Sequence, residues 1–290
     1  MISDITLGQF FPGNSILHRL DPRTKLILTV FFIAAVFIAS TPIAFFILFA
    51  LTASLVAISR ISMKVIFKGI KPIIFVLIFT ALINVFMTKA EGEPLVDFFI
   101  ITIYLNGVIR AFFMAFRVVI LIVGTSVLLT YTTSPIALTD GIENLLSPLK
   151  KINVPVHVFA MMMTIALRFI PTLIEETEKI MNAQKSRGAD FASGSLVKRA
   201  KALIPLLVPL FVSSFKRADE LATAMECRCY RGDKKRTKLV KLSYKIRDYV
   251  WLASGAVFLL AMILMTVYSD GLFSYIPEAV HSVIFYRIYK

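Results

Sequence analysis

Five long runs of apolar side chains constrain the fold of this chain more than any other feature of its sequence. The runs are Leu26–Ser40, Ile43–Ile58, Pro72–Met87, Ala111–Tyr131 and Val250–Val267. Inside a lipid bilayer each backbone N–H and C=O group must be satisfied by the chain itself, and about 20 apolar residues of helix cross the hydrocarbon core. The chain is 58% hydrophobic, against about 45–50% in soluble domains. We therefore predict an all-α integral membrane protein with about five transmembrane helices.

Basic residues are unevenly distributed along the chain, and this predicts its orientation. Residues 131–248 hold 20 of the 32 Lys and Arg residues, and residues 60–71 are basic without any acid. Residues 91–97 are acidic. Because cytoplasmic loops are enriched in Lys and Arg, we expect the N-terminus, residues 60–71 and residues 131–248 to be cytoplasmic. The same rule accounts for the net charge of +14 without any nucleic-acid partner.

The pattern predicts three parts. Residues 1–130 form an N-terminal membrane domain with about four spans, and residues 249–290 form a last span and a tail. Residues 131–248 form a cytoplasmic or interfacial coupling domain, because their mixed charges at helical spacing are typical of solvated amphipathic helices. Two long helices are expected there, Val154–Arg187 and Leu196–Cys229, with bends at the internal prolines Pro171, Pro205 and Pro209.

Each long helix ends in a short motif centred on an arginine, and these two motifs are the candidate docking residues. They are Ser186-Arg187-Gly188 and Cys227-Arg228-Cys229. An Arg side chain offers a planar fork of donors for carboxylates and backbone carbonyls in a partner's groove, and small neighbours permit close approach. Ordinary helix capping is the alternative explanation for either motif taken alone.

An apolar surface on the same two helices is a candidate contact for a membrane-embedded partner. Its members are Met161, Met162, Met163, Leu203, Leu207 and Phe211. Methionine-rich surfaces repack readily against different partners, although packing between the two helices explains any single one of these residues equally well. The acids Glu175 and Glu176 are expected to be solvated on a charged helix face.

The sequence lacks the motifs that mark several common nucleotide-binding and catalytic sites. The chain contains no phosphate-binding loop of the G-x-x-x-x-G-K-[ST] type, no H-E-x-x-H and no G-x-S-x-G motif. Cys227 and Cys229 point to different helix faces, which argues against a disulfide, and two cysteines alone make no zinc site. Within the apolar runs we interpret Arg117 as a buried structural contact. We expect no catalytic residue, no metal and no directly bound cofactor.

Two other functions stay open at this point. One is a membrane-embedded enzyme acting on lipid head groups, for which Asp140 and Glu143 beside Thr132 and Thr133 are the only near acids. The other is a channel or an autonomous transporter, which predicts substrate flux in liposomes that hold this chain alone.

The motifs and their order resemble the transmembrane T component (EcfT/CbiQ type) of energy-coupling factor (ECF) importers. The resemblance lies in Gly8 to Leu26 with its Asp21-Pro22-Arg23-Thr24-Lys25 stretch, in Leu129 to Pro135, in Leu145 to Leu149, and in the two arginine motifs. The family's coupling motifs are of the Ala-Arg-Gly type. Ser186 and Cys227 here replace the usual Ala, and Cys229 replaces Gly, which predicts looser docking at that end if Gly serves close approach.

The resemblance implies a multi-pass subunit of the bacterial plasma membrane that joins two ABC-type ATPases to a substrate-binding membrane protein, the S component. Arg187 and Arg228 would each dock in a groove of one ATPase. ATP and Mg²⁺ would be bound by those partners and not by this chain. The implied cargo is a vitamin in preference to a metal ion, selected by the S component.

Overall fold

The computed structural model describes residues 10–87, 96–98, 101–189, 191, 195–232 and 242–268. The acidic residues 91–95, Gly8 and Gln9, and the tail 269–290 lie outside the described residues. Contacts between Cα atoms divide the chain into two units, which are taken separately below. Residues 9–134 and 242–290 form the bundle unit, and residues 1–8 and 135–241 are grouped as the α7–α8 unit. The domain boundaries expected from sequence, at 130/131 and 248/249, stay predictions, because the contact density of a chain need not follow a membrane surface.

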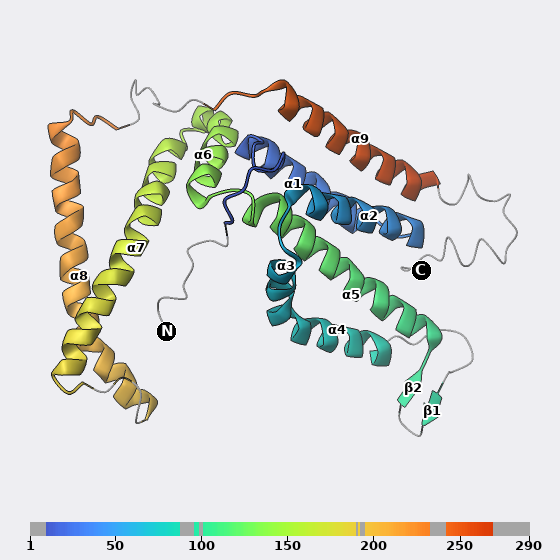
Figure 1. Ribbon diagram of the computed structural model, residues 1–290, viewed down its shortest axis with the longest axis horizontal. Helices are drawn as coiled ribbons and strands as arrows, with labels where there is room; N and C mark the ends of the chain where they lie inside the picture. The colour runs from blue at the N-terminus through green and yellow to red at the C-terminus, as the bar shows by residue number, and fades with distance from the viewer. Residues whose placement is uncertain are drawn as a thin grey trace, which may run out of the picture. The chain divides into compact units, whose positions relative to one another are not determined.

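The described part of the bundle unit is mainly helical (Figure 1). Its elements are α1 (Pro22–Ile38), α2 (Pro42–Ser59), α3 (Met63–Ile70), η1 (Lys71–Ile73), α4 (Ile74–Met87), β1 (Val96–Phe98), β2 (Ile101–Ile103), α5 (Leu105–Thr125), η2 (Ser126–Thr130) and α9 (Ile246–Tyr268). β1 and β2 form an antiparallel hairpin in which Val96 pairs with Ile103. Apart from this hairpin the described chain is helical, which confirms the all-α class.

Helix α1 lies at the centre of the bundle unit, packed between α5 and α9. Its side chains Phe32, Ala35 and Val36 are buried in a core shared with α2 and α5. Two glycines allow the close approach: a Cβ on Gly124 would overlap the ring of Phe32, and a Cβ on Gly255 would overlap Leu28. The start of α1 follows directly from its sequence, because Asp21 caps the helix by accepting the amide of Arg23 and Pro22 occupies the first helical position.

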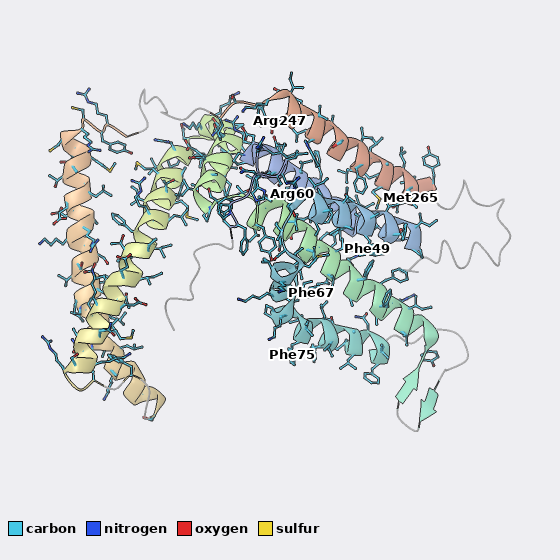
Figure 2. The ribbon with its side chains drawn as sticks, in the orientation of Figure 1. Phe49, Arg60, Phe67, Phe75, Arg247 and Met265 are labelled. Atoms are coloured by element: carbon cyan, nitrogen blue, oxygen red, sulfur yellow. The ribbon has the colours of Figure 1, made fainter. Side chains whose placement is uncertain are left out.

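Five helical segments are long and apolar enough to cross a membrane. They are Pro42–Ser59, Met63–Phe86, Gly107–Thr130, Val156–Ser186 and Ile246–Tyr268. The number of candidate spans agrees with the sequence prediction, but the helices in the set differ. Helix α1 is not among them because it has only 17 residues. Helix α7, expected to run from the membrane onto its surface, is long and apolar enough to be included. Within Met63–Phe86 the chain changes direction at η1, where Pro72 lies (Figure 1). Phe67 and Phe75, on either side of that turn, are highly exposed (Figure 2).

Arg117 makes the buried structural contact that the sequence predicted. Its guanidinium donates to the carbonyl of Ala39, at the end of α1, and lies 5.1 Å from the centre of the Phe45 ring. Arg117 therefore ties α5 to the end of α1 and the start of α2. Helix α5 itself begins at Leu105, six residues earlier than the expected Ala111, and includes Asn106 and Gly107.

The α7–α8 unit contains α6 (Pro135–Leu145), η3 (Ser147–Ile152), α7 (Val156–Ser186) and α8 (Leu196–Cys227). Helix α7 packs against both α6 and α8. The internal prolines Pro171, Pro205 and Pro209 leave both long helices unbroken. Figure 1 shows the N-terminal part of α8 turned away from the line of the rest of that helix, as the two prolines there predict.

Candidate functional site: two arginine-capped helix ends

Helix α7 ends in a Schellman turn around Arg187. The amide of Gly188 donates to the carbonyl of Lys185 over 2.9 Å, and the amide of Ala189 donates to the carbonyl of Gln184 over 3.0 Å. Gly188 has a φ of 87°, in the left-handed region that glycine enters without a steric cost. The chain thus reverses just after Arg187, the C-cap residue, and leaves this side chain at the tip of the helix.

Helix α8 ends in the same turn around Arg228. The amide of Cys229 donates to the carbonyl of Glu226 over 2.8 Å, and the amide of Tyr230 donates to the carbonyl of Met225 over 3.0 Å. Cys229 has a φ of 58° and occupies the place that Gly188 takes on α7. A residue with a Cβ costs roughly 1–2 kcal/mol in this conformation. The backbone angle alone therefore favours Gly at position 229, whether or not a partner approaches this turn closely.

All six residues of the two motifs are exposed. Within the described part of the chain, the guanidinium groups of Arg187 and Arg228 have no hydrogen-bond or ion-pair partner. Open space also surrounds Gly188, where a Cβ would meet nothing within 4 Å. The two arginines are therefore not consumed by capping or packing, and their donors are available to another molecule.

A polar crossing fixes α7 against α8 between these ends. The hydroxyl of Ser213 donates to Oε1 of Glu176 over 2.6 Å, and the Arg217 guanidinium donates to Oε2 of the same carboxylate over 2.5 Å. The expectation that Glu176 is simply solvated was wrong. It is partly buried and paired, because its turn of α7 faces α8, whereas its neighbour Glu175 is exposed.

A second contact shows that the two helices run antiparallel. The Gln184 side chain donates to the carbonyl of Pro205 over 3.5 Å. That carbonyl lacks its usual helical donor, because Pro209, four residues on, has no N–H. Glu176 thus lies beside Ser213 and Gln184 beside Pro205, so the C-terminal ends of α7 and α8 point in opposite directions, as Figure 1 also shows.

The spacing along the helices gives the separation of the two arginines. Arg187 lies eleven residues after Glu176, and Arg228 lies eleven residues after Arg217. At 1.5 Å of rise per residue, each tip is about 16 Å from the crossing, and the two tips are roughly 30 Å apart. One rigid helix pair therefore presents two similar arginine tips at its opposite ends.

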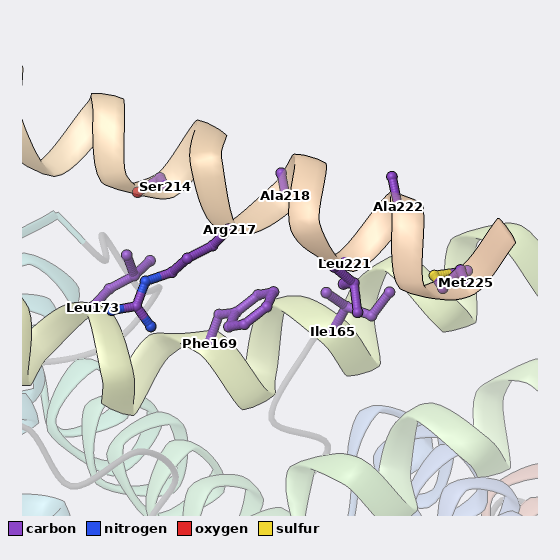
Figure 3. A pocket seen from close by; sticks show the side chains of 9 residues that line it. All are labelled: Ile165, Phe169, Leu173, Ser214, Arg217, Ala218, Leu221, Ala222 and Met225. Carbon is purple, nitrogen blue, oxygen red and sulfur yellow. The ribbon is translucent and has the colours of Figure 1, made fainter. Parts of the chain in front are cut away.

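An apolar seam with a cavity of about 270 Å³ continues the crossing toward the end of α8 (Figure 3). Its lining residues are Ile165, Phe169, Leu173, Ser214, Arg217, Ala218, Leu221, Ala222 and Met225. These side chains form the contact between α7 and α8, together with Glu176 and Ser213. The seam holds the helices together without using the candidate partner-contact residues.

Comparisons with known proteins match nearly the whole chain. A family model described as a cobalt transport protein (CbiQ) matches residues 13–239. The energy-coupling factor transporter transmembrane protein EcfT of Ruminiclostridium cellulolyticum is 53% identical over 265 residues, covering 91% of this chain and 98% of the relative. The EcfT proteins of Clostridium kluyveri and Bacillus subtilis are 52% and 48% identical, over 86% of this chain in each case and over 92% and 93% of their own lengths. The chain belongs to the EcfT family.

Membership of the EcfT family excludes one of the two other functions left open by the sequence. EcfT proteins are named as transmembrane components of a transporter, which is a non-enzymatic role, so the alternative of an enzyme acting on lipid head groups was wrong. Two of its candidate residues have structural partners instead: Glu143 lies 2.9 Å from Nδ1 of His157, and the Thr133 hydroxyl accepts a hydrogen bond from Lys25. The described residues contain no cluster of three or more His, Cys, Asp or Glu side chains that could hold a metal ion.

The candidate contact for a membrane-embedded partner lies outside the α7–α8 seam. Leu203, Leu207 and Phe211 are 46%, 56% and 65% exposed, and Met162 and Met163 are about half exposed. Met161 is less exposed than its two neighbours. Their neighbour Leu206 is instead buried, only 6% exposed. The role of these residues toward a partner stays a prediction.

Sequence reasoning missed Glu176, Ser213 and Arg217, and a signal for one of them was present. Glu176 continues the seam positions Phe169 and Leu173 at intervals of four and three residues, which is the spacing of one helix face. A carboxylate on a buried stripe needs a partner. That requirement points to a polar residue on the facing helix, although the sequence alone does not say which one.

Proposed function

We propose that this EcfT-family chain couples two ABC-type ATPase subunits to a membrane-embedded, substrate-binding S component. The observation that carries the proposal is the pair of exposed arginine caps, Arg187 and Arg228, at the opposite ends of one antiparallel helix pair. Two similar tips, roughly 30 Å apart by helical rise, suit two similar grooves, one on each subunit of an ATPase dimer.

The docking chemistry follows from the exposed guanidinium groups. Each can form paired hydrogen bonds with a carboxylate, or with backbone carbonyls at the end of a partner's helix. ATP and Mg²⁺ are bound by the ATPases in this scheme, and this chain binds neither. When the ATPases close on ATP, the tips are displaced, and the crossing of Glu176 with Ser213 and Arg217 makes the two helices move together.

The exposed stripe of α8, Leu203, Leu207 and Phe211, is the proposed main contact for the S component. Because the two helices are antiparallel, Met161, Met162 and Met163 of α7 lie near the other end of the pair, level with the end of α8, and are proposed as a separate second contact. Contiguous exposed apolar patches of this kind mark surfaces that contact lipid or another apolar surface. Methionine side chains adapt to different neighbours, which suits a surface shared among several S components.

For orientation, we propose that the chain is a multi-pass protein of the bacterial plasma membrane, with its N-terminus and residues 131–248 in the cytoplasm. The distribution of Lys and Arg supports this orientation. For cargo, we propose a vitamin in preference to a metal ion. The family model carries the description of a cobalt transport protein, so uptake assays should compare labelled vitamins directly with Co²⁺ and Ni²⁺.

The test is co-purification in mild detergent from cells that also express the ATPases and the S component. The Arg187→Glu/Arg228→Glu variant should insert in the membrane and keep its thermal stability, because both side chains are exposed, but it should lose the ATPases. The matched control reverses two exposed lysines on the same helices, Lys179→Glu/Lys216→Glu, and should retain them. Equal ATPase recovery from the two double variants would refute the docking role. Substrate flux in liposomes that contain this chain alone would instead support an autonomous transporter.

A further inference from the structure

A cluster of buried charged residues at the start of α1 has no role in the function proposed above. Lys25, Asp21 and Asp248 are 2%, 8% and 3% exposed. Arg23 completes the cluster, with its Nε 3.8 Å from the carboxylate of Asp21. We call these four residues the α1 clamp. Charged groups are rarely this buried unless they are paired and hydrogen-bonded, so their contacts define what the clamp holds.

Lys25 holds the segment that leaves the bundle unit. Its ammonium group donates to the carbonyl of Thr132 over 2.8 Å, to the hydroxyl of Thr133 over 3.2 Å and to the carbonyl of His18 over 3.5 Å. Thr132 and Thr133 follow η2 and come directly before Pro135, where the α7–α8 unit begins. Lys25 is thus attached to the segment that leads into the connection at 134–135.

Asp248 and Arg23 hold the segment that returns. Oδ2 of Asp248 accepts the amide of Lys245 over 2.8 Å, and Oδ1 accepts the amide of Asp21, the N-cap residue of α1, over 2.9 Å. Arg23 donates to the carbonyl of Leu242 over 3.1 Å and lies 5.1 Å from the centre of the Tyr244 ring. Leu242 is the first residue after the α7–α8 unit. The connection at 241–242 is therefore attached to the same turn of α1 as the connection at 134–135.

We propose that the α1 clamp is the positioning element that carries displacement of the α7–α8 unit into the bundle unit. The residues next to two covalent connections between the units, at 134–135 and 241–242, are bonded to the clamp. Charge-assisted hydrogen bonds in a buried site are strong. When one partner is lost, the remaining charge stays buried without the bond that offset its desolvation cost. Movement of either connection therefore takes α1 with it, and α1 in turn contacts α5 and α9.

The proposal rests on the proposed coupling function but assigns a role to residues far in sequence from the arginine tips. It makes one prediction that a merely structural cluster would not. Weakening the clamp should leave ATPase docking intact while nucleotide-driven change in α1 disappears. A structural role alone would lower the yield or the stability of the whole complex and would leave the nucleotide response of the surviving complex unchanged.

The experiment is amide hydrogen exchange on the chain purified with its ATPases in nanodiscs, without nucleotide and with Mg-ATP and vanadate. In the wild type, nucleotide should change exchange in α7, α8 and the first turns of α1. Lys25→Met removes the ammonium group, and Asp248→Asn and Thr133→Val are milder variants that keep side-chain shape. In each variant, the nucleotide-dependent change in exchange of α7 and α8 should persist. The nucleotide-dependent change in α1 should become smaller, and the decrease should be larger for variants that remove more hydrogen bonds of the clamp. Lys64→Met, at an exposed lysine of α3, is the matched control and should respond as the wild type does.

An independent readout uses the chain without nucleotide. Asp248→Asn replaces one of the two accepting carboxylate oxygens with an NH2 group, which cannot accept, and removes the charge from the other. Exchange at Asp21 or Lys245, whichever amide then faces the NH2 group, should rise by about tenfold or more, and exchange at the other amide should rise less. An undiminished nucleotide response of α1 in both Thr133→Val and Asp248→Asn would overturn the proposal, even if Lys25→Met fails to fold. Loss of ATPases from these variants would also overturn it in favour of a structural role. Failure of the wild-type chain to retain ATPases would instead refute the coupling function itself.

Discussion

The carboxylate of Glu176 and the guanidinium of Arg217, 2.5 Å apart, join α7 to α8 at a point equally far from both arginine-capped ends. Each arginine cap lies eleven residues beyond its own member of this pair, so the crossing lies midway between the two arginine tips. Contacts near the middle set the angle between the two arms, and a small change there is enlarged at the tips. The pair is therefore one of the contacts that fix the positions of the two tips, together with the apolar seam and the contact of Gln184 with Pro205.

Glu176→Gln should weaken the crossing, because the neutral amide loses the ion pair with Arg217 while keeping the size of the side chain. Since the pair is only partly buried, we expect a loss of about 1 kcal/mol in stability. Thermal unfolding in detergent measures the loss, and a double-mutant cycle with Arg217→Met isolates the pair. Glu175→Gln, at the exposed neighbouring acid, is the control and should leave the melting temperature unchanged. Equal effects at positions 175 and 176 would contradict the assignment.

Cys229→Gly should stabilise the end of α8. The residue has a φ of 58°, and glycine removes the steric cost of a Cβ in that region, about 1 kcal/mol. Slower amide exchange at Cys229 and Tyr230, the donors of the Schellman turn, measures the gain. Cys227→Gly is the matched control, because position 227 is the last helical residue of α8 and glycine there should destabilise. Faster exchange in Cys229→Gly would show that the turn does not govern this helix end.

Leu206 and Leu207 are neighbours in sequence with opposite expected roles. Leu206→Ala removes a side chain that is 6% exposed and should destabilise the chain by about 2–4 kcal/mol. Leu207→Ala removes one that is 56% exposed, and it should leave the melting temperature of the isolated chain unchanged but reduce recovery of the S component. Recovery of the S component with both variants, measured per folded chain, checks the assignment. Full recovery with Leu207→Ala would remove this residue from the proposed contact.

The helical class and most helix positions could be predicted because they depend on local rules. Asp21-Pro22 and Thr41-Pro42 are cap-then-proline starts, and α1 and α2 begin at those prolines. The start of α5 was misplaced for a local reason as well. Asn106 and Gly107 lie in its first turn, where backbone amides have no intrahelical acceptor, so these residues interrupt nothing there.

The interior polar contacts could not be predicted, because they join residues far apart in sequence. Nothing near Lys25 in the sequence marks it as a buried residue, yet it is buried and bonded to residues more than a hundred positions away. Helical spacing places Glu176 on the face of Phe169 and Leu173, but its partners Ser213 and Arg217 lie on another helix and could not be assigned from the sequence. The arginine motifs were recognisable because each depends on a local turn.

The most direct test of the account places a photoreactive amino acid next to each arginine tip. Benzoylphenylalanine at position 186 or at position 227 leaves Arg187 and Arg228 intact, and both positions are exposed. After irradiation of the assembled complex, the account predicts a cross-link from each position to an ATPase subunit, with the two positions reaching different subunits. Cross-links only to lipid or to the S component, or the absence of any cross-link to an ATPase from both positions, would contradict it.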